Sequence, residues 1–161
     1  MRCQEAIELV KSFESCRLSA YQDSTGIWTL GWGRARDIQP GEACSQAQAD
    51  AWLMSDLDDF EAIVLKAVST PEHGANVMND NQLGAVTSFV FNVGLGKEGV
   101  KDGFLCLKSG GISTLLRLLR EQDWEGAALE FPKWSKAGGL PVPGLLRRRL
   151  AEQVLFLKPV S

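Results

Sequence analysis

The sequence has one histidine, His73, in a chain of 161 residues. A zinc amidase built on two His ligands cannot be assembled from it, and any His-dependent Ser or Cys triad would have to use this one residue. His73 lies in PEHGAN, a segment whose Pro, Gly and Asn are typical of a loop. We therefore expect an exposed, structural histidine.

Cysteines are few and scattered, and none has the CxxC spacing of zinc or redox motifs. We expect the four of them to be free thiols: Cys3, Cys16, Cys44 and Cys106. No apolar run approaches the ~18 residues of a membrane span. The short stretch before Glu14 has no basic-then-apolar leader and is too short for a signal peptide, so we expect that the protein either lacks a secretion signal or has lost one. These absences predict no stable membrane insertion.

Charge is distributed unevenly in a chain whose net charge is −3. Residues 1–100 carry 7 Lys and Arg against 14 Asp and Glu, whereas residues 101–161 carry 10 against 6. The basic part includes the run Arg147–Arg149, which is either a solvated helix face or part of a basic lobe attracted to an anionic polymer. Nucleic acid is excluded as the partner by the overall negative charge and the absence of a recognition motif.

The first 44 residues predict a short helix followed by a small hairpin. Apolar residues at helical spacing indicate a helix that ends near Glu14. Residues 18–22 and 27–32 suit two strands, and the DSTG segment between them is a turn by composition. A third short strand is expected over residues 35–38.

The rest of the chain predicts helices. Ser45 and Gln48 form a capping-box pattern that opens a long helix to about residue 68. Further helices are expected at 80–93, after the caps Ser113 and Asp123, and over 144–157, with an irregular excursion at 94–112 that contains one short helix. The fold class is α+β, mainly α. We expect a single domain over 1–161, with a hairpin lobe at 13–44, a linking helix at 45–68, and a helical lobe formed by 69–161 and the N-terminal helix.

Three side chains near the hairpin form a candidate catalytic set: Glu14, Asp23 and Thr29. Taken alone, a Glu at a helix end is usually a solvated charge and an Asp in DSTG is usually a turn-former. Two carboxyl groups facing one cleft are, however, what glycosidic cleavage requires. One must stay protonated, which needs burial or a nearby negative charge, and the other must stay ionised, which an exposed turn permits.

The pattern E-x8-D-x5-T, present as FESCRLSAYQDSTGIWTLGWG, resembles the catalytic region of phage-type lysozymes, the endolysins of glycoside hydrolase family 24. The resemblance continues in the family's order through NQLGAVTSFVFNVG, STLLRLL, FPKWSKAGG and GLLRRRLAE, over roughly residues 5–157. It implies a lysozyme-like fold, with a small hairpin lobe and a larger helical lobe joined by a long helix. It also implies peptidoglycan bound in the cleft between the lobes.

By this resemblance Glu14 is the general acid for the β-1,4 bond between N-acetylmuramic acid and N-acetylglucosamine. Asp23 matches the carboxylate that aligns or activates water, and Thr29 matches the hydroxyl that helps to hold that water. The substrate-lining positions are Gly31, Trp32, Gly33 and Asn92. Trp32 has two equally good interpretations, stacking on a sugar and packing in the core.

The chain departs from the family at Arg34, where many relatives carry His. An Arg that pairs there with an acid would hold its charge at every working pH. Two alternatives remain open: a lytic transglycosylase acting on the same bond, and a wall-binding module without catalysis. The resemblance further implies an inverting lysozyme (EC 3.2.1.17) and a monomer that needs no metal or organic cofactor. It would accumulate in the host cytoplasm, depend on a holin-type membrane permeabiliser, and act in the periplasm or cell wall.

Overall fold

The computed structural model describes residues 3–23, 25–72, 74–75 and 77–159, so the expectation for His73 lies outside the described residues. Helices dominate these ranges, and two small antiparallel sheets complete them. The elements are α1 (Gln4–Phe13), β1 (Arg17–Gln22), β2 (Trp28–Gly31), α2 (Gln46–Val68), α3 (Asp80–Val93), α4 (Thr114–Arg120), α5 (Trp124–Glu130), the short 3-10 helix η1 (Phe131–Trp134), β3 (Lys136–Ala137), β4 (Leu140–Pro141) and α6 (Pro143–Leu157). The predicted mainly-α α+β class is confirmed. No helix in the described ranges has the length and apolarity needed to span a membrane.

The hairpin forms as predicted, but the third strand does not. β1 and β2 pair antiparallel, with Arg17 opposite Gly31 and Gln22 opposite Trp28. The prediction of a strand over 35–38 is wrong, because Asp37 adopts φ +59°, which breaks an extended segment. The chain returns to β1 a few residues later, where the Cys44 amide donates to the Leu18 carbonyl at 3.0 Å.

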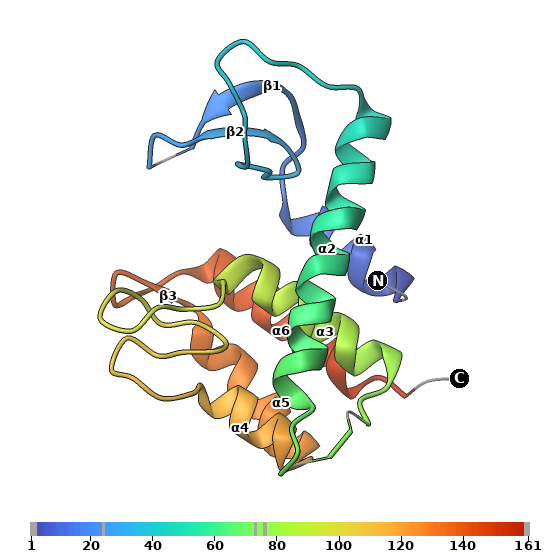
Figure 1. The fold of residues 1–161 in the computed structure, drawn as a ribbon, viewed down its shortest axis with the longest axis vertical. Helices are drawn as coiled ribbons and strands as arrows, with labels where there is room; N and C mark the ends of the chain where they lie inside the picture. Colours follow the sequence, from blue (N-terminus) through green and yellow to red (C-terminus); the bar gives the residue numbers. More distant parts are fainter. Residues whose placement is uncertain (1–2, 24, 73, 76, 160–161) are drawn as a thin grey trace.

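Helix α2 runs from the hairpin lobe into the helical lobe (Figure 1). Its 23 residues give a length of about 35 Å at 1.5 Å per residue. Ser45 begins it by accepting a hydrogen bond from the Gln48 amide at 3.1 Å. One part of α2 packs against β2, and other parts pack against α3 and α4. The two lobes are therefore joined by one continuous helix.

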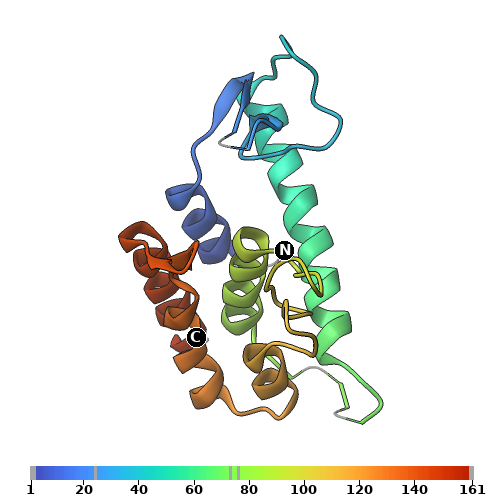
Figure 2. The ribbon, with the colours of Figure 1, turned by 90° about the vertical axis from the view of Figure 1, so that its left-hand side faces the viewer.

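Helix α3 is the centre of the helical lobe. It begins with a capping box between Asn79 and Gln82, and most of its side chains are buried. It packs against α6, α2 and α1, and Figure 2 shows it between α2 and α6. On this helix Phe89 makes edge-to-face contacts with Phe131 at 5.6 Å and with Trp134 at 5.4 Å between ring centroids.

A glycine sets the distance between α3 and α1. A Cβ placed on Gly84 would lie 2.7 Å from the Ala6 Cβ and 2.8 Å from the Cys3 Cβ, both closer than packed carbon atoms approach. Gly84 thus allows α1 to lie directly on the core helix. Because Glu14 immediately follows α1, this close packing also fixes where that carboxyl group can reach.

The segment between α3 and α4 folds as a series of turns, and its predicted short helix is wrong. The reason is close backbone packing: a Cβ on Gly96 would lie 2.0 Å from the Cys106 carbonyl oxygen. Phe104 of this segment is fully buried, and its carbonyl accepts a hydrogen bond from the Ser113 hydroxyl at 2.7 Å. The excursion is therefore irregular but firmly attached to the core.

Candidate active site

Glu14 follows the last residue of α1 and turns its side chain toward the cleft. Its backbone amide closes the helix by donating to the Val10 carbonyl at 3.0 Å. Its Oε1 accepts a hydrogen bond from Arg148 Nη1 at 2.6 Å, and 24% of the side chain is exposed. The sequence analysis required burial or a negative neighbour. The structure instead gives a partly buried carboxyl group with a cationic neighbour.

Arg148 is held from behind by two residues of the core. Its Nε donates to Glu152 Oε1 at 3.2 Å, and Glu152 also accepts from the Ser88 hydroxyl at 2.8 Å. Glu152 is fully buried, and burial raises the pKa of this carboxyl group against the opposing effect of Arg149 and Arg148. Ser88 and Glu152 thus orient the guanidinium that contacts Glu14.

Arg149 is buried on the neighbouring side of α6 and is 0% exposed. Its Nε lies 2.7 Å from Glu152 Oε2, and its guanidinium lies 5.0 Å from the centre of the Phe89 ring. Burial lowers its pKa to about 10. The expectation that Arg147–Arg149 form a solvated face is therefore wrong, because two of the three arginines pack into the core.

Asp23 begins the turn between β1 and β2, and that turn supplies its hydrogen bonds. Asp23 Oδ1 accepts from the Thr25 hydroxyl at 2.7 Å, the Thr25 amide at 2.8 Å and the Ile27 amide at 2.9 Å. The Thr25 hydroxyl, followed by the Ile27 amide, lowers the pKa of this carboxyl group. Asp23 is therefore an ionised carboxylate with a fixed orientation at neutral pH.

Thr29 lies in β2 opposite Tyr21. Only 4% of it is exposed, and its hydroxyl donates to the Ile27 carbonyl at 3.1 Å. That bond uses the hydroxyl hydrogen and leaves the oxygen free to accept. Thr29 and Asp23 thus belong to the same hairpin.

The Gly31–Gly33 segment divides into a packing residue and two cleft residues. Gly31 has φ +64°, and a Cβ there would lie 3.2 Å from the Ala49 Cβ on α2, so it serves close packing. Trp32 donates from Nε1 to Asp50 Oδ1 at 2.7 Å while also lining the cleft. Gly33 lines the same cavity, and a Cβ there would meet no atom within 4 Å.

Asn92 lies near the end of α3, where its Oδ1 accepts from Arg149 Nη2 at 3.0 Å. The buried arginine therefore orients this amide. Asn92 lines two neighbouring cavities together with Glu14, one of about 430 Å³ toward the hairpin lobe and one of about 520 Å³ toward α6. Glu14 and Asn92 thus lie where these two spaces meet.

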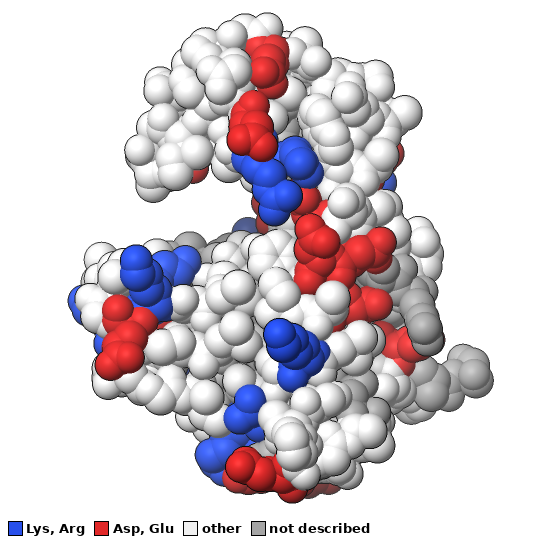
Figure 3. Space-filling model, in the orientation of Figure 1, with Lys and Arg blue, Asp and Glu red and all other residues white. Residues whose placement is uncertain are grey.

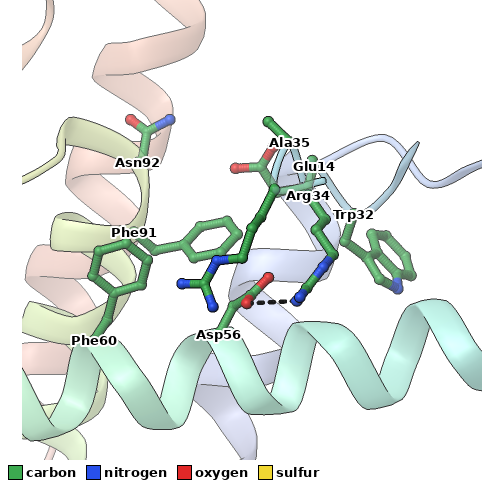
Figure 4. A pocket seen from close by; sticks show the side chains of 10 residues that line it. Glu14, Trp32, Arg34, Ala35, Asp56, Phe60, Phe91 and Asn92 are labelled. Atoms are coloured by element: carbon green, nitrogen blue, oxygen red, sulfur yellow. Dashed lines mark hydrogen bonds and ion pairs between the residues drawn. The ribbon is translucent and has the colours of Figure 1, made fainter. Parts of the chain in front are cut away.

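Figure 3 shows a hollow between the hairpin lobe and the helical lobe, and the residues that line the first cavity come from both lobes and from α2. Figure 4 shows Trp32, Arg34 and Glu14 on one side of the first cavity and Asn92 on another, with α2 beneath them. Of the predicted site residues, the structure brings Glu14, Trp32, Gly33 and Asn92 together here. Gly31 faces α2, and Asp23 and Thr29 are not among the residues that line these two cavities.

The sequence analysis noted Arg34 only as a departure from the family, and it missed Asp56 and Arg148, which also line the cleft. Arg34 forms an ion pair with Asp56 of α2 at 2.9 Å, and both line the first cavity. Arg148 was missed because nothing in the local sequence distinguishes it from the arginines on either side. The available signal was Glu152, which lies four residues after Arg148 and three after Arg149, the spacings that bring helix side chains together.

The chemistry available here is that of carboxyl groups and hydrogen-bonding side chains in an open cleft. Among the described residues, no group of three or more His, Cys, Asp and Glu side chains is arranged to hold a metal ion. A carboxyl group at the meeting point of two cavities is placed to exchange a proton with a bound molecule.

Residues 11–152 match the phage lysozyme family. The chain is 36% identical over 157 residues to the endolysin of Acyrthosiphon pisum secondary endosymbiont phage 1, covering 95% of each, and 34% identical to the endolysin of Salmonella phage P22, covering 94% of each. It spans only 53% of the longer endolysin of Bacillus phage B103. Among solved structures, it is similar to the muramidase domain of SpmX from Asticcacaulis excentricus, with 31% identity, a TM-score of 0.77 and 99% of each chain covered. It is also similar to a mutant of P22 lysozyme, with 31% identity, a TM-score of 0.73 and 97% of each chain covered. The chain belongs to the phage lysozyme family.

Proposed function

We propose that this protein is a muramidase, a phage or prophage endolysin that hydrolyses the β-1,4 bond between N-acetylmuramic acid and N-acetylglucosamine in peptidoglycan. The observation that carries the proposal is the position of Glu14, whose carboxyl group lies where two cavities of an interlobe cleft meet. Membership of the phage lysozyme family supports a peptidoglycan hydrolase. Glu14 protonates the glycosidic oxygen as the leaving sugar departs.

The hairpin supplies the other side of the reaction. Asp23 remains ionised because its turn donates three hydrogen bonds to it, and it activates or aligns water on the opposite face of the sugar. Thr29 offers a hydroxyl oxygen on the strand that follows and helps to hold that water. A glycan seated in the cleft completes the burial of Glu14. This arrangement predicts inversion of configuration at the anomeric carbon when the two carboxyl groups are about 6.5–9.5 Å apart, with water between them.

The remaining groups bind and position the sugar chain. Trp32 offers part of an aromatic face, and Asn92 offers an amide oriented by Arg149. Gly31 supports Trp32 and Gly33 from the α2 side. We propose that the protein works as a monomer after accumulating in the host cytoplasm, and that it reaches the cell wall through a holin-type permeabiliser.

Product analysis tests this proposal. Purified peptidoglycan is digested in water enriched in oxygen-18, and the fragments are examined by mass spectrometry. Hydrolysis is expected to place the label on new N-acetylmuramic acid reducing ends, and NMR at early times is expected to show the inverted anomer. Unlabelled 1,6-anhydro ends would identify a lytic transglycosylase instead. Wall binding without any cleavage would identify a non-catalytic module.

A further inference from the structure

One carboxylate oxygen of α2 connects the hairpin lobe to the helical lobe behind the proposed glycan cleft. Asp50 Oδ1 accepts hydrogen bonds from Trp32 Nε1 at 2.7 Å and from Gln46 Nε2 at 3.0 Å, and it lies 3.0 Å from Lys11 Nζ. Trp32 follows β2 in the hairpin lobe, whereas Lys11 lies in the last turn of α1. The described residues that line the two cleft cavities include Trp32 but not Asp50. Asp50 therefore holds a wall of the cleft from outside it.

These donors keep Asp50 ionised. The hydrogen bond from the Trp32 indole, followed by the one from the Lys11 ammonium, lowers the pKa of this carboxyl group. A charged acceptor in turn binds the indole N–H more strongly than a neutral acceptor would. The polar edge of the Trp32 ring is therefore tied to α2.

Lys11 restricts the same indole from a second direction. Its Nζ lies over the Trp32 ring, 5.3 Å from the ring centre, so one ammonium group makes both an ion pair with Asp50 and a cation–π contact. Lys11 is three residues before Glu14, the residue that ends α1. Figure 4 shows Trp32 and Glu14 beside the first cavity, with α2 beneath them. The position of the indole relative to Glu14 is thus set through Asp50 and Lys11.

The rest of the indole is shared between the protein and the cleft. Trp32 packs against a small apolar cluster formed by Ile7, Val10, Leu53 and Leu57. It nevertheless remains only half-buried and lines the first cavity. An indole has a single hydrogen-bonding group, and Asp50 binds it, so the open part of the ring offers carbon surface alone. Such a surface suits the apolar C–H face of a pyranose ring.

We propose that Asp50 is a positioning residue for glycan binding, which holds the Trp32 indole in the cleft wall with its carbon surface toward the sugar. Without Asp50 the indole would populate other rotamers, and binding would then include the cost of ordering it. Loss of Asp50 should therefore weaken binding of the glycan and affect the chemical step much less. The inference rests on the proposed function for the identity of the ligand.

The first test is a double-mutant cycle on the full chain, with kcat and KM measured on a soluble glycan. Asp50→Leu is expected to raise KM about tenfold and to leave kcat within about threefold of the parent. Trp32→Phe keeps an aromatic ring but has no N–H for Asp50 to bind, so adding Asp50→Leu to it should change KM little. Asp50→Asn keeps an oxygen that can accept from the indole and should recover most of the affinity. Asp59→Asn, at an exposed position of α2, is the control and should match the parent.

The second test follows the indole itself and needs no cleavage. The side-chain N–H of Trp32 gives one resonance in the NMR spectrum of nitrogen-15-labelled protein, assigned by its absence from Trp32→Phe. An oligosaccharide of alternating N-acetylglucosamine and N-acetylmuramic acid is added in a Glu14→Gln background, where it stays intact. The oligosaccharide is expected to shift this resonance. Adding Asp50→Leu should move the resonance toward that of a free indole and weaken binding about tenfold.

The outcomes separate this inference from the proposed function. The inference is overturned if a folded Asp50→Leu variant keeps the parent's KM and affinity, or if Asp50→Asn is impaired as much as Asp50→Leu. It is also overturned if the effects of Asp50→Leu and Trp32→Phe on KM multiply in the double variant. Oligosaccharide binding that depends on Asp50, in a protein that never cleaves the glycan, would uphold the inference and contradict the muramidase proposal. Cleavage with a KM that is independent of Asp50 would do the reverse.

Discussion

Asp23 carries its charge because its own turn supplies three hydrogen-bond donors to one oxygen. The largest effect on its lowered pKa comes from the Thr25 hydroxyl, and the Ile27 amide comes next. A carboxyl group with a lowered pKa stays ionised at pH values where an ordinary carboxyl group would begin to take up a proton. It becomes protonated only as the pH falls through the lowered pKa. The acid limb of the activity profile therefore depends on Thr25.

Replacing Thr25 by Val removes that hydroxyl while keeping the branched shape. The pKa of Asp23 is expected to rise toward its ordinary value, so the acid limb of kcat/KM should move to higher pH while the plateau rate stays close to that of the parent. The measurement is the pH dependence of kcat/KM on a soluble glycan. Thr25→Ser, which keeps the hydroxyl, is the matched control and should reproduce the parent's profile. An unchanged acid limb in Thr25→Val would show that protonation of Asp23 does not control it.

Single residues differ in how far the sequence predicts them. Glu14, Asp23 and Thr29 lie in one short segment, and their spacing identifies them as candidates once the resemblance in the later segments of the chain is added. The ion-pair partner of Glu14 could not be predicted, because Arg148 is 134 residues away along the chain. The residues on either side of Arg148 are also arginines. Its orientation depends on Ser88 and Glu152, which meet it only after α3 and α6 have packed.

At the scale of elements, one ion pair ties the hairpin lobe to the linking helix. Arg34 follows β2 and pairs with Asp56 of α2 at 2.9 Å, and its guanidinium lies 5.4 Å from the centre of the Trp52 ring. Burial raises the pKa of Asp56, and Arg34 opposes that effect. The contribution of Asp56 to the free energy of unfolding is therefore greatest at a pH below the ordinary pKa of an aspartate. It is lost as the pH rises through the raised pKa of the folded protein. At neutral pH Arg34 offsets the cost of an ionised, partly buried Asp56.

Substitution of Arg34 by His should make this connection depend on pH. The free energy of unfolding of Arg34→His is expected to be close to the parent's at pH 5 and about 1–2 kcal/mol lower at pH 8, where the imidazole is neutral. Urea unfolding at the two pH values measures this difference. Arg34→Gln, which has no charge at either pH, is the control and should be destabilised at both. Equal stability of the parent and Arg34→His at pH 8 would contradict a stabilising role for the pair.

The elements themselves were largely predictable from periodicity and caps. Ser45, Ser113 and Asp123 each accept the hydrogen bond expected of an N-cap. The errors fall where local composition and backbone geometry disagree. Asp37 takes a positive φ inside a segment that suited a strand, and Gly96 admits a backbone contact that no local pattern reveals.

At the scale of the whole molecule, three neighbouring cavities meet at Asn92, and two of them also contact Glu14. This continuity depends on long-range packing: α1 lies on α3 through Gly84, and α6 brings Arg148 to Glu14. The sequence predicted two lobes and a linking helix, and the family resemblance placed Glu14, Trp32, Gly33 and Asn92 in one cleft. Local patterns did not show that Arg148 would join Glu14 there. The third of these cavities is lined in part by residues 100–102 and Lys108, so its shape depends on turns for which the sequence analysis expected a short helix.

The central claim is that Glu14 is the acid that cleaves the glycan, and the most direct test is the rate of reducing-end formation by Glu14→Gln. The substitution keeps the size of the side chain and removes its acidity, so the rate is expected to fall by about 100- to 10,000-fold while glycan binding persists. Glu8→Gln, on the exposed face of α1, is the matched control and should retain the parent's rate. A folded Glu14→Gln variant that cleaves at the parent's rate would contradict the account.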